Sequence, residues 1–440
     1  NSQIEPNRPI LVYRDPLAPI PANSTRKEVE VVQQAEPVEV IQEEAEPETE
    51  VKVAFLKDAE VTTDMHDDDT VLSELAAEEG DLVLFDRINI WVGGAVQFDA
   101  YSHRDLLNLD GEGTSTSANL RRGEVILRSS YHEQGEVKVQ YDIAEKVFRD
   151  FYWRWQFKSQ DANLTVGQQK EPMGFDYLMG NKFGTAMERS SASSEFSSFR
   201  STGVRLNRWI DFGEQRRVAG ISATRATASV GVFTRDIGLD SANDTDVSLT
   251  GRATLGNAID GERGLHVGIG GTYRQGNFDS VAPRPEMHIA ERIQLAEIDA
   301  DELLTVALET GASFGSVHGQ AELFVSKYSD GPIEGDGWGG YAQVGWFITG
   351  EHRDYRPRVG LWAPVNRLGN SAWEVFTRFS FTKGDSEFDP SNHLAQLSGG
   401  VNWYFRQFRS SVNLLYAETD RPVEGYDDGA AIIARVQYLF

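Results

Sequence analysis

The basic residues of this 440-residue chain recur at alternate positions of short segments, where they share a face with other polar side chains. Arginine suits phosphate-like oxyanions because its planar guanidinium makes two parallel hydrogen bonds, whereas lysine supplies a compact point charge. The candidate anion contacts are Arg122, Arg128, Lys138, Arg154, Lys158, Arg205 and Arg378. Acidic residues fall on the same faces, namely Glu124, Glu136, Asp142, Glu322 and Glu374. These residues indicate reversible recognition of charged solutes, with the preferred sign of charge left open.

Catalysis has little support in the sequence. The eight histidines are scattered, and none lies in a Gly-x-Ser-x-Gly or His-Glu-x-x-His pattern. The chain has no cysteine, which excludes disulfides and thiol chemistry. The acidic run His66–Asp69 lacks the spacing of a calcium-binding loop. We predict neither an enzyme nor a cofactor or metal site.

Strands are the elements that place these charges on one face, because side chains alternate across a strand with a period of two. Glu136–Asp142 alternates three apolar residues with four polar ones, and Phe151–Lys158 alternates four aromatic residues with Tyr152 and three polar residues. The sequence contains no run of 18 apolar residues, so it predicts no transmembrane helix. Bulky apolar faces on strand after strand predict an all-β, transmembrane antiparallel β-barrel, with lipid outside and a polar lumen inside.

The number of strands follows from the alternating segments that begin at Arg87. We count sixteen to eighteen, and the uncertain ones lie at 285–300 and 215–235. Bacterial barrels with both chain ends on the periplasmic side have an even number of strands. Sixteen is the prediction and eighteen the alternative.

The final segment, Ala431–Phe440, alternates in the same way. Arg435 is predicted to point into the lumen, while Tyr438 and Phe440 point outward as interfacial aromatics. We expect this segment to close the barrel by pairing with the strand that begins near Ile88.

Composition divides the chain near Asp86. Residues 1–86 carry six Lys and Arg against 22 Asp and Glu, for a net charge of −16, while residues 87–440 carry 36 against 46, for −10. The Glu- and Pro-rich segment 28–50 has too few apolar residues to bury, so residues 1–86 are predicted to form an acidic, mostly extended tail. Residues 87–440 would form the barrel domain. Since no basic patch is present, nucleic acid is not predicted as a partner.

Several segments, taken in order, resemble the phosphate-selective porin O and P family of Gram-negative outer membranes. They are Leu120–Leu127, Glu136–Asp142, Val166–Pro172, Met187–Ser190, Arg284–Glu286, Gly340–Glu351, Ala372–Val375, Gly400–Tyr404 and Arg435–Phe440. The resemblance covers roughly residues 88–440. It implies a sixteen-stranded, homotrimeric barrel whose third loop, about 171–199, folds into the lumen as a constriction.

The resemblance also implies roles for individual residues. Lys170, Glu188 and Arg189 would stand at the constriction, although Glu188 and Arg189 could equally form a structural ion pair that ties the loop to the wall. Arg122 would contribute to the anion path, whereas Arg121 would face the lumen only near a rim or a bulge. Tyr438 and Phe440 would form the terminal signal that the barrel assembly machinery recognises.

These features together predict a passive outer-membrane porin, surrounded by lipid and lipopolysaccharide, that conducts small ions or solutes. Because the first residue is Asn1, we expect a mature chain whose secretory signal has been removed, with its tail in the periplasm. An anion or phosphate preference is one possibility. A cation-preferring or solute-specific channel, or an envelope-anchoring barrel whose acidic tail binds a periplasmic partner, stays open.

Overall fold

The computed structural model describes residues 82–84, 88–108, 113–132, 134–197, 199–218, 221–234, 245–259, 263–365, 371–389 and 391–440. Almost all of the predicted acidic tail therefore lies outside the described residues. Within the range predicted as tail, β1 (Leu82–Leu84) forms a short strand that pairs with the start of the barrel.

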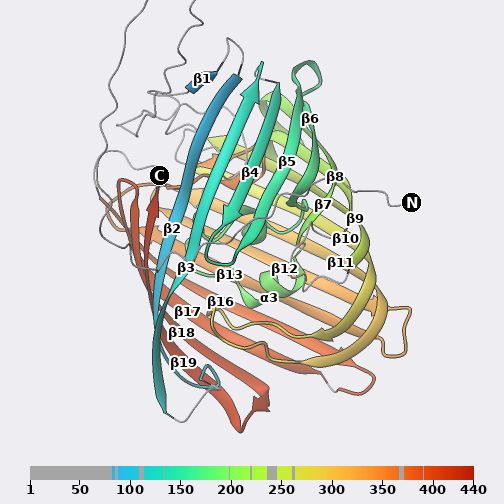
Figure 1. Cartoon of the computed structure of the whole chain (residues 1–440), viewed down its shortest axis with the longest axis vertical. Helices are drawn as coiled ribbons and strands as arrows, with labels where there is room; N and C mark the ends of the chain where they lie inside the picture. The colour runs from blue at the N-terminus through green and yellow to red at the C-terminus, as the bar shows by residue number, and fades with distance from the viewer. Residues whose placement is uncertain are drawn as a thin grey trace, which may run out of the picture. The chain divides into compact units, whose positions relative to one another are not determined.

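Sixteen antiparallel strands form a closed barrel (Figure 1). They are β2 (Ile88–Asp105), β3 (Thr114–Tyr131), β4 (Gly135–Asp142), β5 (Val147–Phe157), β6 (Ala162–Lys170), β7 (Arg200–Val218), β8 (Ile221–Thr234), β9 (Thr245–Ile259), β10 (Arg263–Val281), β11 (Ala296–Phe314), β12 (Val317–Ser329), β13 (Gly335–Phe347), β16 (Ala372–Ser386), β17 (Asn392–Phe405), β18 (Phe408–Val423) and β19 (Tyr426–Leu439). Each strand pairs with the next, and β19 pairs with β2 to close the ring. The prediction of sixteen strands is confirmed.

The chain enters the barrel at Ile88 and leaves it at Leu439 on the same side, which we call the terminus end; the other side is the far end. Backbone hydrogen bonds join Gly94 and Phe440 in both directions, at 2.8 and 3.1 Å. The backbone of Phe440 is thus paired with β2, and this extends the β19–β2 pairing by one residue.

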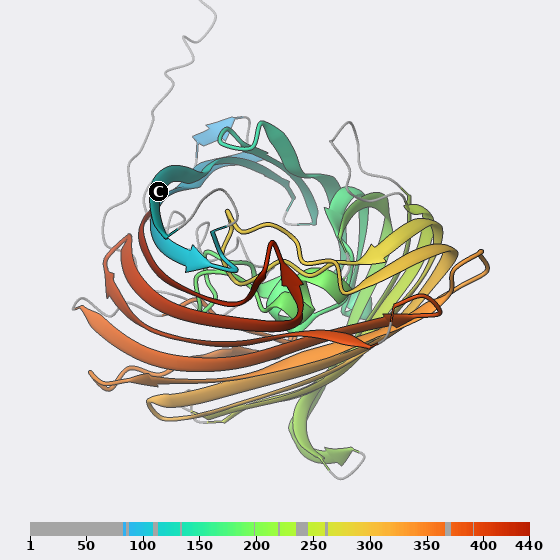
Figure 2. The same ribbon diagram turned by 90° about the horizontal axis from the view of Figure 1, so that it is seen from below.

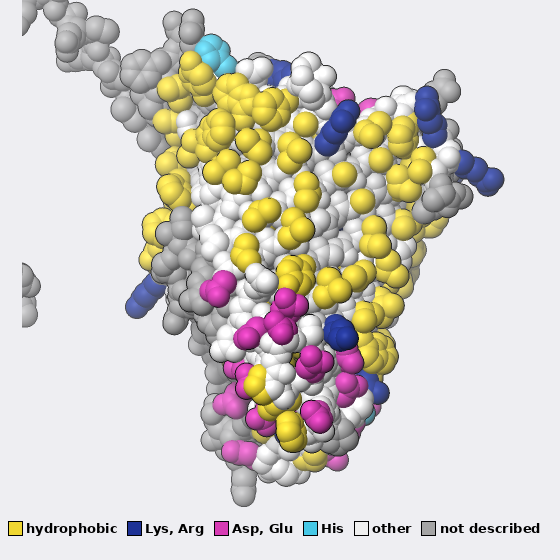
Figure 3. All heavy atoms as spheres, turned by 90° about the vertical axis from the view of Figure 1, so that its right-hand side faces the viewer, with side chains coloured by type: hydrophobic (Ala, Val, Ile, Leu, Met, Phe, Trp, Pro, Cys, Tyr) yellow, Lys and Arg dark blue, Asp and Glu magenta, His cyan; other side chains and the backbone are white. Residues whose placement is uncertain are grey.

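Alternation along the strands sorts side chains between the two faces of the barrel, as predicted. On β19, Ile432 and Val436 are 53% and 51% exposed, whereas Arg435 between them is 2% exposed. Figure 3 shows apolar side chains spread over the outer surface nearer the terminus end, while acidic side chains gather at the far end. The far-end carboxylates include the exposed Asp299 and Asp336. The apolar band is the part of the wall that suits contact with lipid.

Three connecting segments fold into the barrel. Loop 3 (171–199) contains the short helices α2 (Phe175–Met179) and α3 (Ser191–Phe196), and it confirms the predicted inward third loop. The far-end segment (282–295) joins β10 to β11, and its trace crosses the interior beside loop 3 in Figure 2. The terminus-end segment (348–365) follows β13 and carries the two-residue strands β14 (Tyr355–Arg356) and β15 (Leu361–Trp362). In the described part of the chain, no helix is long and apolar enough to cross a membrane.

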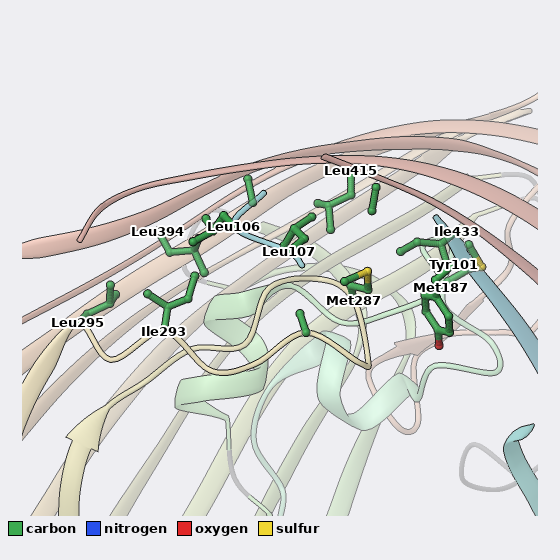
Figure 4. Packing of buried hydrophobic residues seen from close by; sticks show 13 residues of the cluster. Tyr101, Leu106, Leu107, Met187, Met287, Ile293, Leu295, Leu394, Leu415 and Ile433 are labelled. Carbon is green, nitrogen blue, oxygen red and sulfur yellow. The ribbon is translucent and has the colours of Figure 1, made fainter. Parts of the chain in front are cut away.

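Apolar clusters fix these segments to the inner wall. Met287 and Ile293 of the far-end segment pack with Leu106, Leu394 and Leu415, as Figure 4 shows. The far-end segment, which crosses the interior (Figure 2), is therefore attached to the wall at this cluster. Burial of this apolar surface stabilises its position.

A second apolar cluster joins loop 3 to the terminus-end segment. Phe175 and Met179 of loop 3 pack with Tyr355, Leu361 and Trp362. Segments that enter from opposite ends of the barrel thus meet inside it. This contact leaves one part of the lumen filled and another part open.

Candidate functional site: a cationic cavity in the lumen

The open part of the lumen is a cavity between the inner faces of β3–β9 and the inserted segments, with an empty volume of about 1280 Å³ that includes space open to solvent. Among the described residues that line it, ten are basic and two are acidic. The basic residues are Arg122, Lys138, Arg154, Lys170, Lys182, Arg189, Arg200, Arg205, Arg252 and Arg358. The acidic residues are Glu124 and Asp150. The barrel domain is acidic in total, yet its cavity is strongly basic.

Asp150 is shared between two cations of the cavity. Its carboxylate accepts hydrogen bonds from Lys138 Nζ at 2.6 Å and from Arg200 Nε at 2.7 Å. One carboxylate therefore holds two basic side chains in place and offsets only part of their charge. The strand alternation on β5 places Asp150 on the same inner face as Tyr152 and Arg154.

Glu124 is arranged in the same way on β3. It accepts from Arg122 at 2.9 Å and from Lys182 of loop 3 at 3.1 Å. Lys182 thus joins the loop to the wall and adds a cation to the cavity. Because the wall has a low dielectric constant, these fixed charges act on solutes more strongly than they would in bulk water.

Seven of the predicted pore residues line the cavity. They are Arg122, Glu124, Lys138, Arg154, Lys170, Arg189 and Arg205. Arg154 donates to Thr165 and to the Tyr152 hydroxyl at 3.2 Å each. Lys170 donates to the carbonyl oxygen of Leu178 in loop 3 at 2.7 Å. That these residues select ions stays a prediction.

Arg378 and Arg435 lie on the inner wall and contact loop 3. Arg435 donates to both carboxylate oxygens of Asp99, at 2.7 and 2.6 Å, and to Glu188 at 2.6 Å. Arg378 donates to the backbone oxygen of Glu188 at 2.8 Å and to Gln343. Both arginines therefore anchor the loop. Arg128 is buried on the inner face of β3, 5.9 Å from the ring centre of Trp91.

Glu188 is an anchor of loop 3, bonded to Arg435 on one side and to Arg121 on the other. Arg121 is the extra residue of a β-bulge, because Gln97 pairs with Arg122 while Phe98 pairs with Leu120. The bulge turns Arg121 inward, which strict alternation would not do. Burial would raise the pKa of Glu188, but the charges of Arg121 and Arg435 outweigh it and hold that pKa well below its usual value.

Arg189 behaves differently from Glu188. Its guanidinium lies 4.5 Å from the ring centre of Tyr177 and donates to the Tyr177 carbonyl oxygen at 3.3 Å. The contacts of Glu188 thus favour the structural alternative for that residue, while Arg189 lines the cavity.

The predicted position of Lys158 requires a correction. It was expected on the inner face at the end of a strand, but β5 ends at Phe157 and Lys158 begins the 3-10 turn Lys158–Gln160. Its side chain is exposed in this turn at the terminus end, and Lys158 is not among the described residues that line the cavity. The turn breaks the period of two, so the alternation of Phe151–Phe157 no longer decides where the next side chain points.

Two of the acidic residues predicted on the lumen faces, Glu322 and Glu374, contact loop 3. Glu322 accepts hydrogen bonds from the backbone amides of Phe175 and Asp176, at 2.5 and 2.8 Å. Glu374 accepts a hydrogen bond from Thr185 of loop 3 at 3.1 Å, and from Tyr404 and Asn402 of β17 at 2.6 and 2.8 Å. Neither carboxylate lines the basic cavity.

Sequence reasoning missed five charged residues of the cavity, namely Asp150, Lys182, Arg200, Arg252 and Arg358. A signal existed for two of them. Asp150 continues the alternation of β5 by one step, and Arg252 alternates with the buried Thr250 and Thr254 on β9. Lys182 and Arg358 lie in inserted segments without a period, so the sequence held no comparable signal for them.

Comparison with known proteins identifies the family. The family described as phosphate-selective porin O and P matches residues 127–440. The chain belongs to this family. It is an outer-membrane porin, and membership implies a channel rather than an enzyme.

Two curated relatives resemble the porin over much of its length. Porin O of Pseudomonas aeruginosa is 25% identical over 401 residues, which cover 79% of this chain and 88% of that protein. An uncharacterised protein of Caulobacter vibrioides is 28% identical over 305 residues, which cover 66% of this chain and 60% of that protein.

Solved structures with 10% identity show the same fold. The anion-selective porin from Comamonas acidovorans has a TM-score of 0.51 and covers 80% of this chain and 100% of its own. OmpT, an outer membrane protein of Vibrio cholerae, has a TM-score of 0.50, with 82% of this chain and 100% of its own covered.

Proposed function

We propose that this porin conducts anions in preference to cations, with inorganic phosphate among them, by passive diffusion and without a cofactor. The observation that carries the proposal is the composition of the cavity, whose described lining contains ten basic side chains and two acidic ones. The family description, phosphate-selective porin O and P, and the name of the anion-selective porin from Comamonas acidovorans support the same sign of charge.

The cavity favours anions through its field and its hydrogen-bond donors. A diffusion pore discriminates by width and by the charges at its constriction. Arg122, Lys138 and Arg154 lie on three successive strands and supply neighbouring donors along one wall. An anion leaving one donor meets the next, so contact is repeated without a single tight site that would trap it.

Reversal potential in planar bilayers under a potassium chloride gradient tests the proposal. We expect the sign of an anion-selective pore, and phosphate added in competition should reduce the chloride current. A clearly cation-selective potential would overturn the proposal. The alternative of a cation-preferring channel would then apply.

We further propose that the porin is a homotrimer with its terminus end in the periplasm, its tail on that side, and lipopolysaccharide around its far end. Tyr438 is 39% exposed, and its ring stacks 6.1 Å from that of Phe440. This aromatic pair supports recognition of the last strand by the barrel assembly machinery. Phe440→Ala should lower the amount of folded porin in the outer membrane, and an unchanged amount would contradict this role.

A further inference from the structure

The cationic cavity has a second face that inorganic anions cannot use. Leu178 of loop 3 and Val359 and Leu361 of the terminus-end segment line it alongside the basic residues. Leu178 and Val359 are only partly buried, and they pack against the cluster that joins the two inserted segments. The cavity is therefore amphipathic, basic along the strands and apolar along the inserted segments.

Hydrogen bonds from two cations fix this apolar face. Lys170 donates to the carbonyl oxygen of Leu178 at 2.7 Å. Arg252 donates to the carbonyl oxygens of Val359 and Gly360 at 3.0 and 2.8 Å. Arg252 is itself fixed by three hydrogen bonds to the carboxylate of Glu309 on β11, at 2.9, 3.0 and 2.6 Å. The backbone of the apolar face is thus attached to the charged wall at both inserted segments.

Trp209 of β7 adds an aromatic surface to the same cavity. The guanidinium carbon of Arg358 lies 5.8 Å from the centre of the Trp209 ring. Trp209 is 7% exposed, and its ring positions the Arg358 guanidinium beside the apolar residues, where it can meet the charged head of a solute.

An apolar face offers no benefit to a hydrated inorganic ion. Apolar side chains left in water forgo the stabilisation that burial would give them. A solute with an apolar body removes that surface from water while its charged head pairs with the basic wall. Binding sites for organic molecules combine these features, since they are largely apolar with a few placed polar groups.

From this geometry we infer that the cavity selects small organic anions, those in which a carboxylate or phosphate head adjoins an aromatic or aliphatic body. The inference rests on the proposed anion preference and deepens it. Inorganic phosphate passes along the basic wall, whereas an organic anion also contacts Leu178 and Val359. Its residence in the pore is longer, so it interrupts the current of smaller anions.

Current block in single channels of the full-length porin tests this inference. Benzoate and acetate carry the same charge and the same carboxylate, and they differ in the apolar body. In potassium chloride, benzoate should interrupt the current at lower concentration than acetate does. Equal block by the two anions in an anion-selective channel would overturn the inference and leave the proposed function standing. A cation-selective channel would overturn both.

Two variants locate the contact. In Val359→Thr, which replaces a methyl by a hydroxyl of similar size, the benzoate affinity should fall roughly fourfold, the effect of one buried methyl-sized group. Leu178→Asn should lower it further, and it provides a second reading if Val359→Thr does not fold. In both variants, block by phosphate should stay unchanged. If the advantage of benzoate over acetate persists in both, the assignment to this apolar face is wrong.

Val365→Thr is the matched control. Val365 lies in the same terminus-end segment but packs with Phe347, Ala372 and Tyr404 in a different cluster, away from the cavity lining. The substitution is the same as at Val359. It should lower stability and leave the benzoate advantage intact, and a loss of that advantage would show that general loosening of the segment explains the result.

Discussion

The inner wall along β3–β7 presents basic side chains to an open cavity, whereas ionic residues of β12, β16, β18 and β19 contact loop 3. On the first side, Lys138 and Arg200 share Asp150 and remain at the cavity surface. On the second side, Glu322 accepts two loop amides and Arg435 contacts two carboxylates. Similar residue types thus line the cavity on one side and attach loop 3 on the other. The net charge of the barrel domain therefore does not indicate the charge of its cavity.

Arg435→Met should produce the largest effect, on stability and on loop 3. Asp99 and Glu188 would then be buried without their shared partner, which typically costs about 3–5 kcal/mol. Loss of the folded electrophoretic form on heating should occur at lower temperature, with greater protease cleavage in loop 3. Arg154→Met serves as control, because Arg154 lines the cavity and donates to Thr165 and Tyr152, which lie on the wall strands β6 and β5. Equal destabilisation by the two substitutions would contradict the division of the wall.

Charge reversal on the cavity side should produce the next largest effect, on selectivity. Arg122→Glu and Lys170→Glu each change the charge by two in a confined, low-dielectric space, so the reversal potential should shift towards cations. Lys158→Glu makes the same change at an exposed turn outside the lumen and should leave the potential unchanged. If Lys158→Glu shifts the potential as much, the cavity is not the selective region.

Neutralising a cavity carboxylate should have a smaller effect on selectivity than charge reversal, and in the opposite direction. Asp150→Asn removes one of the two acidic groups of the cavity, so anion selectivity should increase. Glu322→Gln removes a buried carboxylate that contacts loop amides, so selectivity should stay the same while loop 3 loosens. Reversal potentials and open-channel noise distinguish the two. An equal rise in anion selectivity would mean that Glu322 also acts on permeating ions.

The smallest expected effect is that of low pH on the contacts of loop 3. Since the pKa of Glu188 is held well below its usual value in the folded porin, its contribution to stability is present above the ordinary carboxylate pKa and is lost as pH falls through the lowered value. Loop 3 should therefore keep its contacts at pH 5, and the conductance noise should rise only under stronger acid. In Glu188→Gln this acid dependence should disappear. An unchanged dependence would assign it to other groups.

The sequence predicted the wall of the barrel well and its contents poorly. Alternation in Phe151–Phe157 and Ala431–Phe440 showed which face each residue would occupy, because a strand admits only two faces. It failed at Lys158, where a turn replaces the strand, and at Arg121, where a bulge adds a residue. Both are local departures from the period, and the sequence does not mark them.

Partner choice could not be predicted from spacing. Glu322 and Phe175 are 147 positions apart, and Arg435 and Asp99 are 336 apart, so their contacts arise only when the barrel closes and loop 3 enters it. The terminus-end segment (348–365) gave no periodic signal, and its folding into the lumen was not predicted. The predictions for the acidic tail concern residues outside the described range.

The sequence by itself determined the transmembrane wall, since period-two alternation over sixteen segments separates lipid-facing from lumen-facing side chains wherever the strands lie. Only the tertiary structure decided which lumen charges face permeating solutes. The inserted segments bind the carboxylates of one side through backbone amides and arginines, and they leave the basic side chains of the other side at an open surface. A lumen charge can act on permeating solutes where the inserted segments leave its side chain lining the cavity, and that depends on contacts between residues far apart in the chain.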